Sequence, residues 1–181
     1  MLQSLWANVA GKGKKDIRTI LKANMLFKEL SPKDLRFVTN ILHIRHYHNG
    51  ETVFRQGEIG FGMYIIAEGT VDITTAVQNS DVSNQADETL VTRLGPDDFF
   101  GELALVEENG TRSANARAVT DTRLIGFFKP DLLEILERRP ATGVKILLGL
   151  SEVLAQRLID TTGKMARLNE ELHLLKGETA K

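Results

Sequence analysis

The sequence predicts a mainly β protein with flanking helices, an α+β class in which an antiparallel β-jelly-roll barrel follows N-terminal helices and precedes one long C-terminal helix. Two observations predict this architecture. Between about residues 43 and 128, short apolar or alternating runs are separated by glycines, which is typical of an antiparallel sandwich or small barrel. On both sides of this region the apolar residues recur at helical spacing instead.

The chain begins with Leu2, Leu5, Trp6 and Val9 at the spacing of one helical face, so residues 1–15 are expected to form an N-terminal helical extension. No unbroken apolar stretch precedes a small-residue cleavage site, which argues against a signal peptide. No run of about 18 apolar residues occurs, so no transmembrane helix is expected. We therefore expect a cytoplasmic protein without a membrane partner.

The barrel domain is expected over residues 16–138, with helices at both of its ends. Ser31 and Pro32 supply an N-cap and a first helical position for one of these helices. Residues 78–89 have almost no apolar side chains and are expected to form a long loop between two strands. The clearest strand patterns lie at residues 52–54, 63–66, 70–73 and 123–127.

Charge and cysteine content exclude several classes of protein. The 23 Lys and Arg residues against 24 Asp and Glu give a formal net charge of −1, so no basic excess favours general nucleic-acid binding. There are no cysteines, which removes disulfide frameworks, thiolate zinc sites and cysteine nucleophiles. The sequence has no Gly-x-x-x-x-Gly-Lys-Ser/Thr loop and no nucleophile elbow, so we expect a binding protein and not an enzyme.

The segment over residues 99–114 carries the chemistry. Gly101 admits close approach of the backbone to a ligand, and the helix-forming run after it, ELALVEE, offers free N–H groups that suit a phosphate. Arg112 can close on the same anion with charge-assisted hydrogen bonds. Glu102 is an acceptor when ionised and would repel a phosphate, so its natural partner in a nucleotide is a ribose hydroxyl. The plainer alternative is a surface ion pair between Glu102 and Arg112.

The string FGELALVEENGTRSANARA, at residues 100–118, closely resembles the phosphate-binding cassette of cyclic-nucleotide-binding domains, in the form found in bacterial catabolite activators. Residues 26–31, 50–58 and 62–71 are similar to the entry segment and the glycine-punctuated strands of that family. The resemblance covers roughly residues 15–175 and implies the family's jelly-roll fold.

The resemblance also implies a ligand and a site. The implied ligand is a 3′,5′-cyclic nucleotide, with cAMP expected and cGMP as the alternative, and no metal takes part. Glu102 would bind the ribose 2′-hydroxyl, while Arg112 and Ser113 would bind the cyclic phosphate. Backbone groups would be presented to the ligand by the other residues of the cassette turn, which are Gly101, Leu103 and Ala104.

A short helix is expected from Pro130 to Leu136, and a long one over residues 139–176 before a tail at 177–181. Along the long helix, apolar residues repeat at alternating spacings of four and three, as at the a and d positions of a heptad repeat. An exposed stripe of this kind predicts a homodimer through a parallel two-stranded coiled coil. The seam consists of Leu147, Ser151, Leu154, Leu158, Thr161, Met165, Leu168, Leu172 and Leu175.

Thr161 interrupts this seam with a hydroxyl group, which by itself would set the register of the coiled coil. Residues 157–164, however, resemble the stretch of the activators' dimer helix in which two adjacent hydroxyl residues reach the adenine. The resemblance therefore implies that Thr161 and Thr162 contact the base of the nucleotide.

The family's activators add a DNA-binding winged helix after the dimer helix. Six residues follow Leu175, so no DNA-binding domain is expected, and the sequence is that of a free-standing sensor or of a truncated chain. The expected function is a dimeric sensor that couples binding of a cyclic nucleotide in the barrel to its C-terminal helix. It would pass the signal to an unidentified protein.

Two other functions stay open. A degenerate barrel that binds no nucleotide would serve as a protein-interaction and dimerisation module. A cupin-like metal enzyme would need a histidine on a later strand, but the remaining histidine, His173, lies in the long helix. Its other ligands would come from His43, His46, His48 and Glu51.

Overall fold

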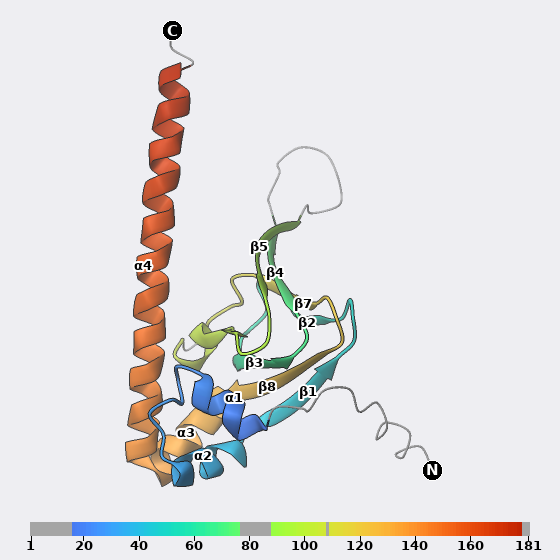
Figure 1. The fold of residues 1–181 in the computed structure, drawn as a ribbon, viewed down its shortest axis with the longest axis vertical. Helices are drawn as coiled ribbons and strands as arrows, with labels where there is room; N and C mark the ends of the chain where they lie inside the picture. Colours follow the sequence, from blue (N-terminus) through green and yellow to red (C-terminus); the bar gives the residue numbers. More distant parts are fainter. Residues whose placement is uncertain (1–15, 77–87, 108, 179–181) are drawn as a thin grey trace.

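The computed structural model describes residues 16–76, 88–107 and 109–178. The predicted extension over residues 1–15 lies outside these residues, as do residues 78–87 of the predicted loop and 179–181 of the predicted tail. In the described part of the chain two short helices precede a barrel, and a short and a very long helix follow it (Figure 1). The helices are α1 (Ile17–Ala23), α2 (Pro32–Thr39), α3 (Lys129–Arg138) and α4 (Pro140–Glu178).

The strands of the described residues form two four-stranded antiparallel sheets, and together these sheets make up the barrel. The order is β1-β8-β3-β6 in one sheet and β2-β7-β4-β5 in the other. This arrangement confirms the predicted jelly-roll barrel. The strands are β1 (His43–Tyr47), β2 (Thr52–Phe54), β3 (Gly62–Glu68), β4 (Val71–Ala76), β5 (Glu88–Leu94), β6 (Phe99–Phe100), β7 (Asn115–Ala118) and β8 (Thr122–Phe128).

The predicted loop over residues 78–89 extends too far at its C-terminal end. Glu88 and Thr89 belong to β5, where they pair with Ala76 and Thr75 of β4. Glu88 Oε2 also accepts a hydrogen bond of 2.8 Å from Thr74 Oγ1. These polar residues are exposed, so cross-strand pairing rather than apolar burial holds them in the strand.

The ELALVEE run forms one turn of 3₁₀ helix, η1 (Glu102–Leu105), where the sequence predicted a longer helix. The Ala104 N–H donates to the Gly101 carbonyl at 3.2 Å, and the Val106 N–H donates to the Leu103 carbonyl at 3.0 Å. Both are the short-range bonds of a 3₁₀ turn. Leu105 is buried, so packing against the core fixes this tight turn beside the barrel.

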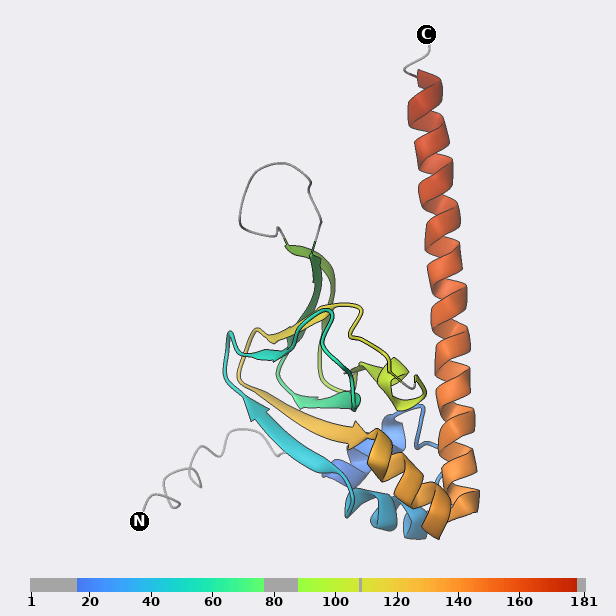
Figure 2. The same ribbon diagram turned by 180° about the vertical axis from the view of Figure 1, so that it is seen from behind.

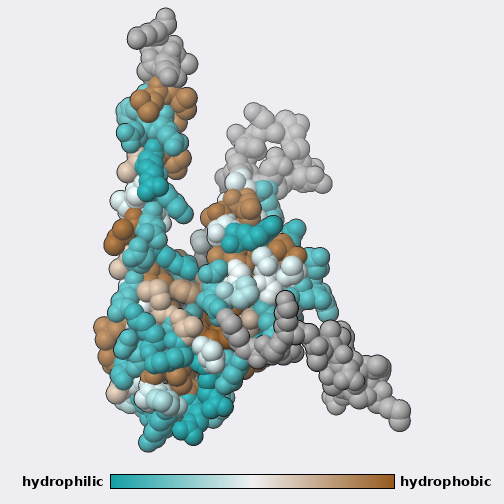
Figure 3. All heavy atoms as spheres, in the orientation of Figure 1, coloured by the Kyte–Doolittle hydropathy of each residue, from teal (hydrophilic) through white to brown (hydrophobic). Residues whose placement is uncertain are grey.

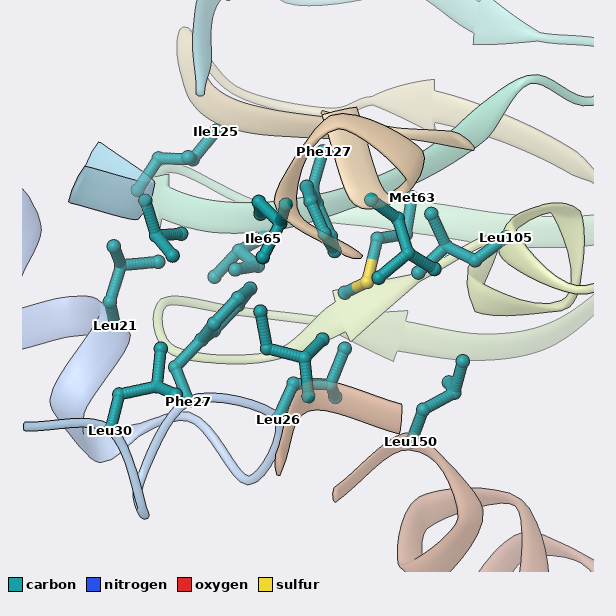
Figure 4. Packing of buried hydrophobic residues seen from close by; sticks show 14 of the residues in the cluster. Leu21, Leu26, Phe27, Leu30, Met63, Ile65, Leu105, Ile125, Phe127 and Leu150 are labelled. Carbon is teal, nitrogen blue, oxygen red and sulfur yellow. The ribbon is translucent and has the colours of Figure 1, made fainter. Parts of the chain in front are cut away.

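The main hydrophobic core lies between one sheet of the barrel and the helices (Figure 4). Phe27 of the N-terminal region meets Phe127 of β8 edge to face, with ring centroids 5.6 Å apart. Leu105 of η1 and Leu150 of α4 are buried in the same cluster. The core therefore fixes the position of η1 and of the first half of α4 relative to the barrel.

Asp34 joins α2 to the junction of α3 and α4. Its carboxylate accepts hydrogen bonds from Ser31 Oγ at 2.6 Å, Thr142 Oγ1 at 3.0 Å and Arg139 Nη1 at 3.3 Å. These donors, Ser31 first, hold the pKa of Asp34 below its usual value. The stabilisation that Asp34 contributes is therefore present above the unfolded pKa of an aspartate and is lost as the pH falls toward the lowered folded value.

Gly149 allows α4 to approach the N-terminal segment closely. A Cβ at this position would lie 2.9 Å from the carbonyl oxygen of Met25 and 3.0 Å from the Cα of Leu26. By contrast, a Cβ at Gly163, farther along α4, would meet no atom within 4 Å.

Gly149→Val is therefore expected to lower the free energy of unfolding by about 1–3 kcal/mol, because the added side chain overpacks against backbone that cannot move freely. Gly163→Ala is the matched control in the same helix and should raise it by about 0.5–1 kcal/mol, since alanine favours the helix. Urea denaturation measures the free energy of unfolding of both variants. Equal effects at the two positions would contradict the close packing of α4.

Candidate functional site

A cavity of about 490 Å³ opens between the barrel, η1 and α4. This volume lies in the range of small-molecule sites. In Figure 2, the short η1 turn lies between the barrel and α4. The lining includes Gly101, Glu102, Leu103, Ala104, Arg112 and Ser113 of the predicted cassette, together with Phe54, Ile73, Val91, Leu94, Leu154, Arg157, Leu158 and Thr161.

Gly101 stands where only glycine fits easily. Its φ of 79° lies in the left-handed region. A Cβ on Gly101 would lie 2.5 Å from Arg112 Nη1 and 3.3 Å from the Gly62 carbonyl oxygen. The missing side chain therefore leaves room for Arg112 to lie against the start of η1.

Arg112 is a buried cation, with 8% of its surface exposed. Its Nη1 donates to the Gly101 carbonyl at 3.2 Å, and its guanidinium lies 4.0 Å from the centroid of the Phe54 ring. It forms no ion pair with any carboxylate in the described residues. Burial lowers the pKa of Arg112, because the charged form loses water. An anion in the cavity would supply the missing counter-charge.

Glu102 is 3% exposed, and its two carboxylate oxygens have different surroundings. Oε1 accepts a hydrogen bond of 2.6 Å from Arg157 Nη1. Oε2 is buried and has no hydrogen-bond partner in the described part of the chain. Leaving a buried acceptor unpaired costs about 1–3 kcal/mol, so Oε2 is set to accept a hydrogen bond from a ligand. The alternative reading, a surface ion pair between Glu102 and Arg112, is not found among the described residues.

Arg157 is a charged residue of the cavity that the sequence analysis did not single out. Besides its bond to Glu102, its Nη2 donates to the Phe99 carbonyl at 3.0 Å, and its guanidinium lies 5.0 Å from the Phe99 ring centroid. Arg157 therefore fastens α4 to the cassette. A signal was present in the sequence, because Arg157 precedes Thr161 by four residues and so shares its helix face.

The two threonines of α4 are placed differently. Thr161 lines the cavity, whereas Thr162 is not among the lining residues, because one step along a helix turns a side chain by about 100°. Both hydroxyls donate to carbonyls one turn back, Thr161 to Arg157 at 2.7 Å and Thr162 to Leu158 at 2.8 Å. The structure thus brings one of the two predicted base contacts to the cavity.

From the cavity outward, α4 carries an exposed apolar stripe, seen in Figure 3 as brown groups between teal ones. Leu158 is 68% exposed, Met165 59% and Leu168 57%. These are positions of the predicted heptad seam, and the described residues leave them uncovered. None of the described helices is long and apolar enough to cross a membrane.

The histidines of the predicted cupin-like alternative point to separate partners. His43 Nε2 lies 3.3 Å from Asp131 Oδ1, whereas His48 Nδ1 lies 3.6 Å from Asp121 Oδ1. Across the described residues, no cluster of three or more His, Cys, Asp or Glu side chains could hold a metal ion.

The family model for the cyclic nucleotide-binding domain matches residues 44–139. The chain is 33% identical over 138 residues to the cyclic AMP receptor protein of Thermus thermophilus, which covers 76% of this chain and 59% of the receptor. The crystal structure of the catabolite activator protein of Thermus thermophilus aligns with a TM-score of 0.69 and 30% identity, over 81% of this chain and 63% of that one.

A cGMP-dependent protein kinase, isozyme 2, of Drosophila melanogaster is 35% identical over 95 residues, which cover 52% of this chain and 10% of the kinase. This chain therefore spans less than two thirds of the length of each of these relatives.

Proposed function

Because this chain belongs to the cyclic nucleotide-binding domain family, we propose that its cavity binds a 3′,5′-cyclic nucleotide, with cAMP as the preferred ligand. The buried pair of Arg112 and Glu102 carries this proposal. A cyclic phosphate has one negative charge, which matches the unpaired cation of Arg112. A ribose 2′-hydroxyl is a donor, which matches the unpaired Oε2 of Glu102.

In the proposed complex, the cassette binds the sugar and phosphate in the manner that the sequence predicted. Arg112 and Ser113 bind the cyclic phosphate, and Gly101 and Leu103 face it with backbone groups. The Ala104 N–H already donates to the Gly101 carbonyl, so it is not free to bind the phosphate. Ala104 instead contributes a small buried side chain to the wall of the site.

The surroundings proposed for the base favour adenine. Ile73, Val91, Leu94 and Leu158 line the cavity away from the cassette, and Thr161 adds a hydroxyl. Adenine and guanine each carry one amino group, but guanine also has a carbonyl oxygen and a ring N–H, and burying these without partners is costly.

The proposed signal runs from the ligand to α4. Glu102 binds Arg157 through one oxygen and would bind the ribose through the other, so a ligand changes the environment of the contact that fastens α4. We propose that two copies pair through the exposed stripe of α4, which makes pairing and nucleotide binding interdependent.

Isothermal titration with cAMP, cGMP and cyclic di-GMP tests the proposal. We expect cAMP to bind most tightly, cGMP more weakly, and cyclic di-GMP not at all, because its two linked nucleotides exceed the single cassette. Failure of all three to bind folded protein would favour the degenerate barrel, whose role would be dimerisation through the exposed stripe.

Removing the ribose hydroxyl tests Glu102. For the wild type, 2′-deoxy-cAMP should bind about 10- to 150-fold more weakly than cAMP, because a hydrogen bond to a charged group contributes about 1.5–3 kcal/mol. In Glu102→Gln this difference should shrink. Glu137→Gln, an exposed change on α3, is the control and should keep the wild-type difference. Equal differences in all three proteins would show that another group binds the hydroxyl.

A further inference from the structure

An exposed apolar patch lies where three elements meet at the cassette end of the barrel. Phe61 is 65% exposed, Leu133 on α3 is 56% exposed, and Val106 after η1 is 46% exposed. Lys129 links them, since its N–H donates to the Phe61 carbonyl at 2.8 Å and its Nζ donates to the Glu107 carbonyl at 2.9 Å. Leu133 is one helical turn beyond Lys129. We call Phe61, Val106 and Leu133 the α3 patch.

Two carboxylates lie on the rim of the α3 patch, beside the ammonium group of Lys129. Glu107 follows Val106 directly, and Glu137 lies one turn beyond Leu133 on α3. Both carboxylates are exposed, and neither forms an ion pair with another residue that the structure describes. An exposed apolar patch of this kind marks an interaction site. Its complement is a segment with an apolar face and basic side chains.

This chain contains such a segment outside the described residues. We propose that residues 1–15 dock on the α3 patch. They contain no Asp or Glu, and their apolar side chains recur at the spacing of one helical face. Fifteen residues extend at most about 50 Å, which is enough to cross a domain of this size. The docking residues are Leu2, Leu5, Trp6 and Val9, and the basic ones are Lys12, Lys14 and Lys15.

The charge of the neighbouring side chains distinguishes the α3 patch from the other exposed surfaces as a docking site for this segment. A groove beside α1 and α2 is lined by Arg18, Lys22 and Arg36, which would repel the three lysines of the segment. The exposed stripe of α4 is assigned to a second copy of the chain in the proposed function. A basic amphipathic segment can also bind an anionic membrane, so vesicles belong in the test.

Trp6 is the single tryptophan of the chain, so fluorescence reports on this segment alone. In the full wild-type chain we expect blue-shifted emission and protection from acrylamide quenching. Leu133→Glu should shift the emission to that of tryptophan in water and raise the quenching constant several-fold. Leu90→Glu, at a residue of β5 that is 52% exposed, is the matched control and should keep the wild-type spectrum.

Both substitutions replace exposed side chains, and circular dichroism verifies that each variant is folded. Raising the salt concentration should weaken the protection, because screening reduces the attraction between the lysines and the two rim carboxylates. Three results would overturn the proposal. They are water-like emission in the wild type, an unchanged spectrum in Leu133→Glu, and a blue shift that appears only with vesicles of phosphatidylserine and phosphatidylcholine.

Discussion

Arg112→Ala is expected to weaken cAMP binding by roughly 30-fold to several thousandfold. Removing one charged partner from a desolvated pair costs about 2–5 kcal/mol, and each 1.4 kcal/mol is about a factor of ten in affinity. The guanidinium is buried beside Gly101 and forms no ion pair in the described residues, whereas the neighbouring cation, Arg157, is already paired with Glu102.

Calorimetry and thermal unfolding measure this effect together. At a concentration one hundred times its dissociation constant, cAMP should stabilise the wild type by about 2.7 kcal/mol, and at the same concentration the variant should gain far less. Arg117→Ala is the matched control, because Arg117 is exposed on β7 and does not line the cavity. Unchanged affinity in a folded Arg112→Ala would remove Arg112 from the phosphate site.

The fold was predictable where local chemistry decides it. Ser31 caps α2 as expected, with its Oγ accepting from the Asp34 N–H at 3.2 Å, because capping depends only on neighbouring residues. The sequence predicts a loop at Glu88 and Thr89 because both are polar, but exposed polar residues also occur in strands. Their place in β5 depends on pairing with β4, and a single sequence does not show which strands pair.

The candidate site was predictable in the cassette, where Gly101, Glu102 and Arg112 lie within twelve residues of one another and line one cavity. Arg157 was missed because its role depends on how α4 packs on the barrel, fifty-five residues away from Glu102 in the chain. The choice between Thr161 and Thr162 depends on the same packing, since it fixes the rotation of α4.

Leu168→Lys is expected to convert the dimer into monomers. Leu168 is 57% exposed in a single chain and occupies a d position of the proposed seam, so the substitution would place like charges opposite each other. Thr161 belongs to the same seam and lines the cavity, so pairing and binding must affect each other by the same factor. Cyclic AMP should therefore bind about 5- to 150-fold more weakly to the variant.

Leu174→Lys is the matched control, because Leu174 is 64% exposed on the same helix but lies off the seam. It should leave both the sedimentation coefficient and the affinity unchanged, which separates loss of pairing from the effect of a new charge on α4. If Leu168→Lys is monomeric and still binds cAMP as tightly as the wild type, the cavity is complete within one chain. In that case Arg157 would hold α4 to the barrel without help from a second copy, and the exposed stripe would serve dimerisation alone.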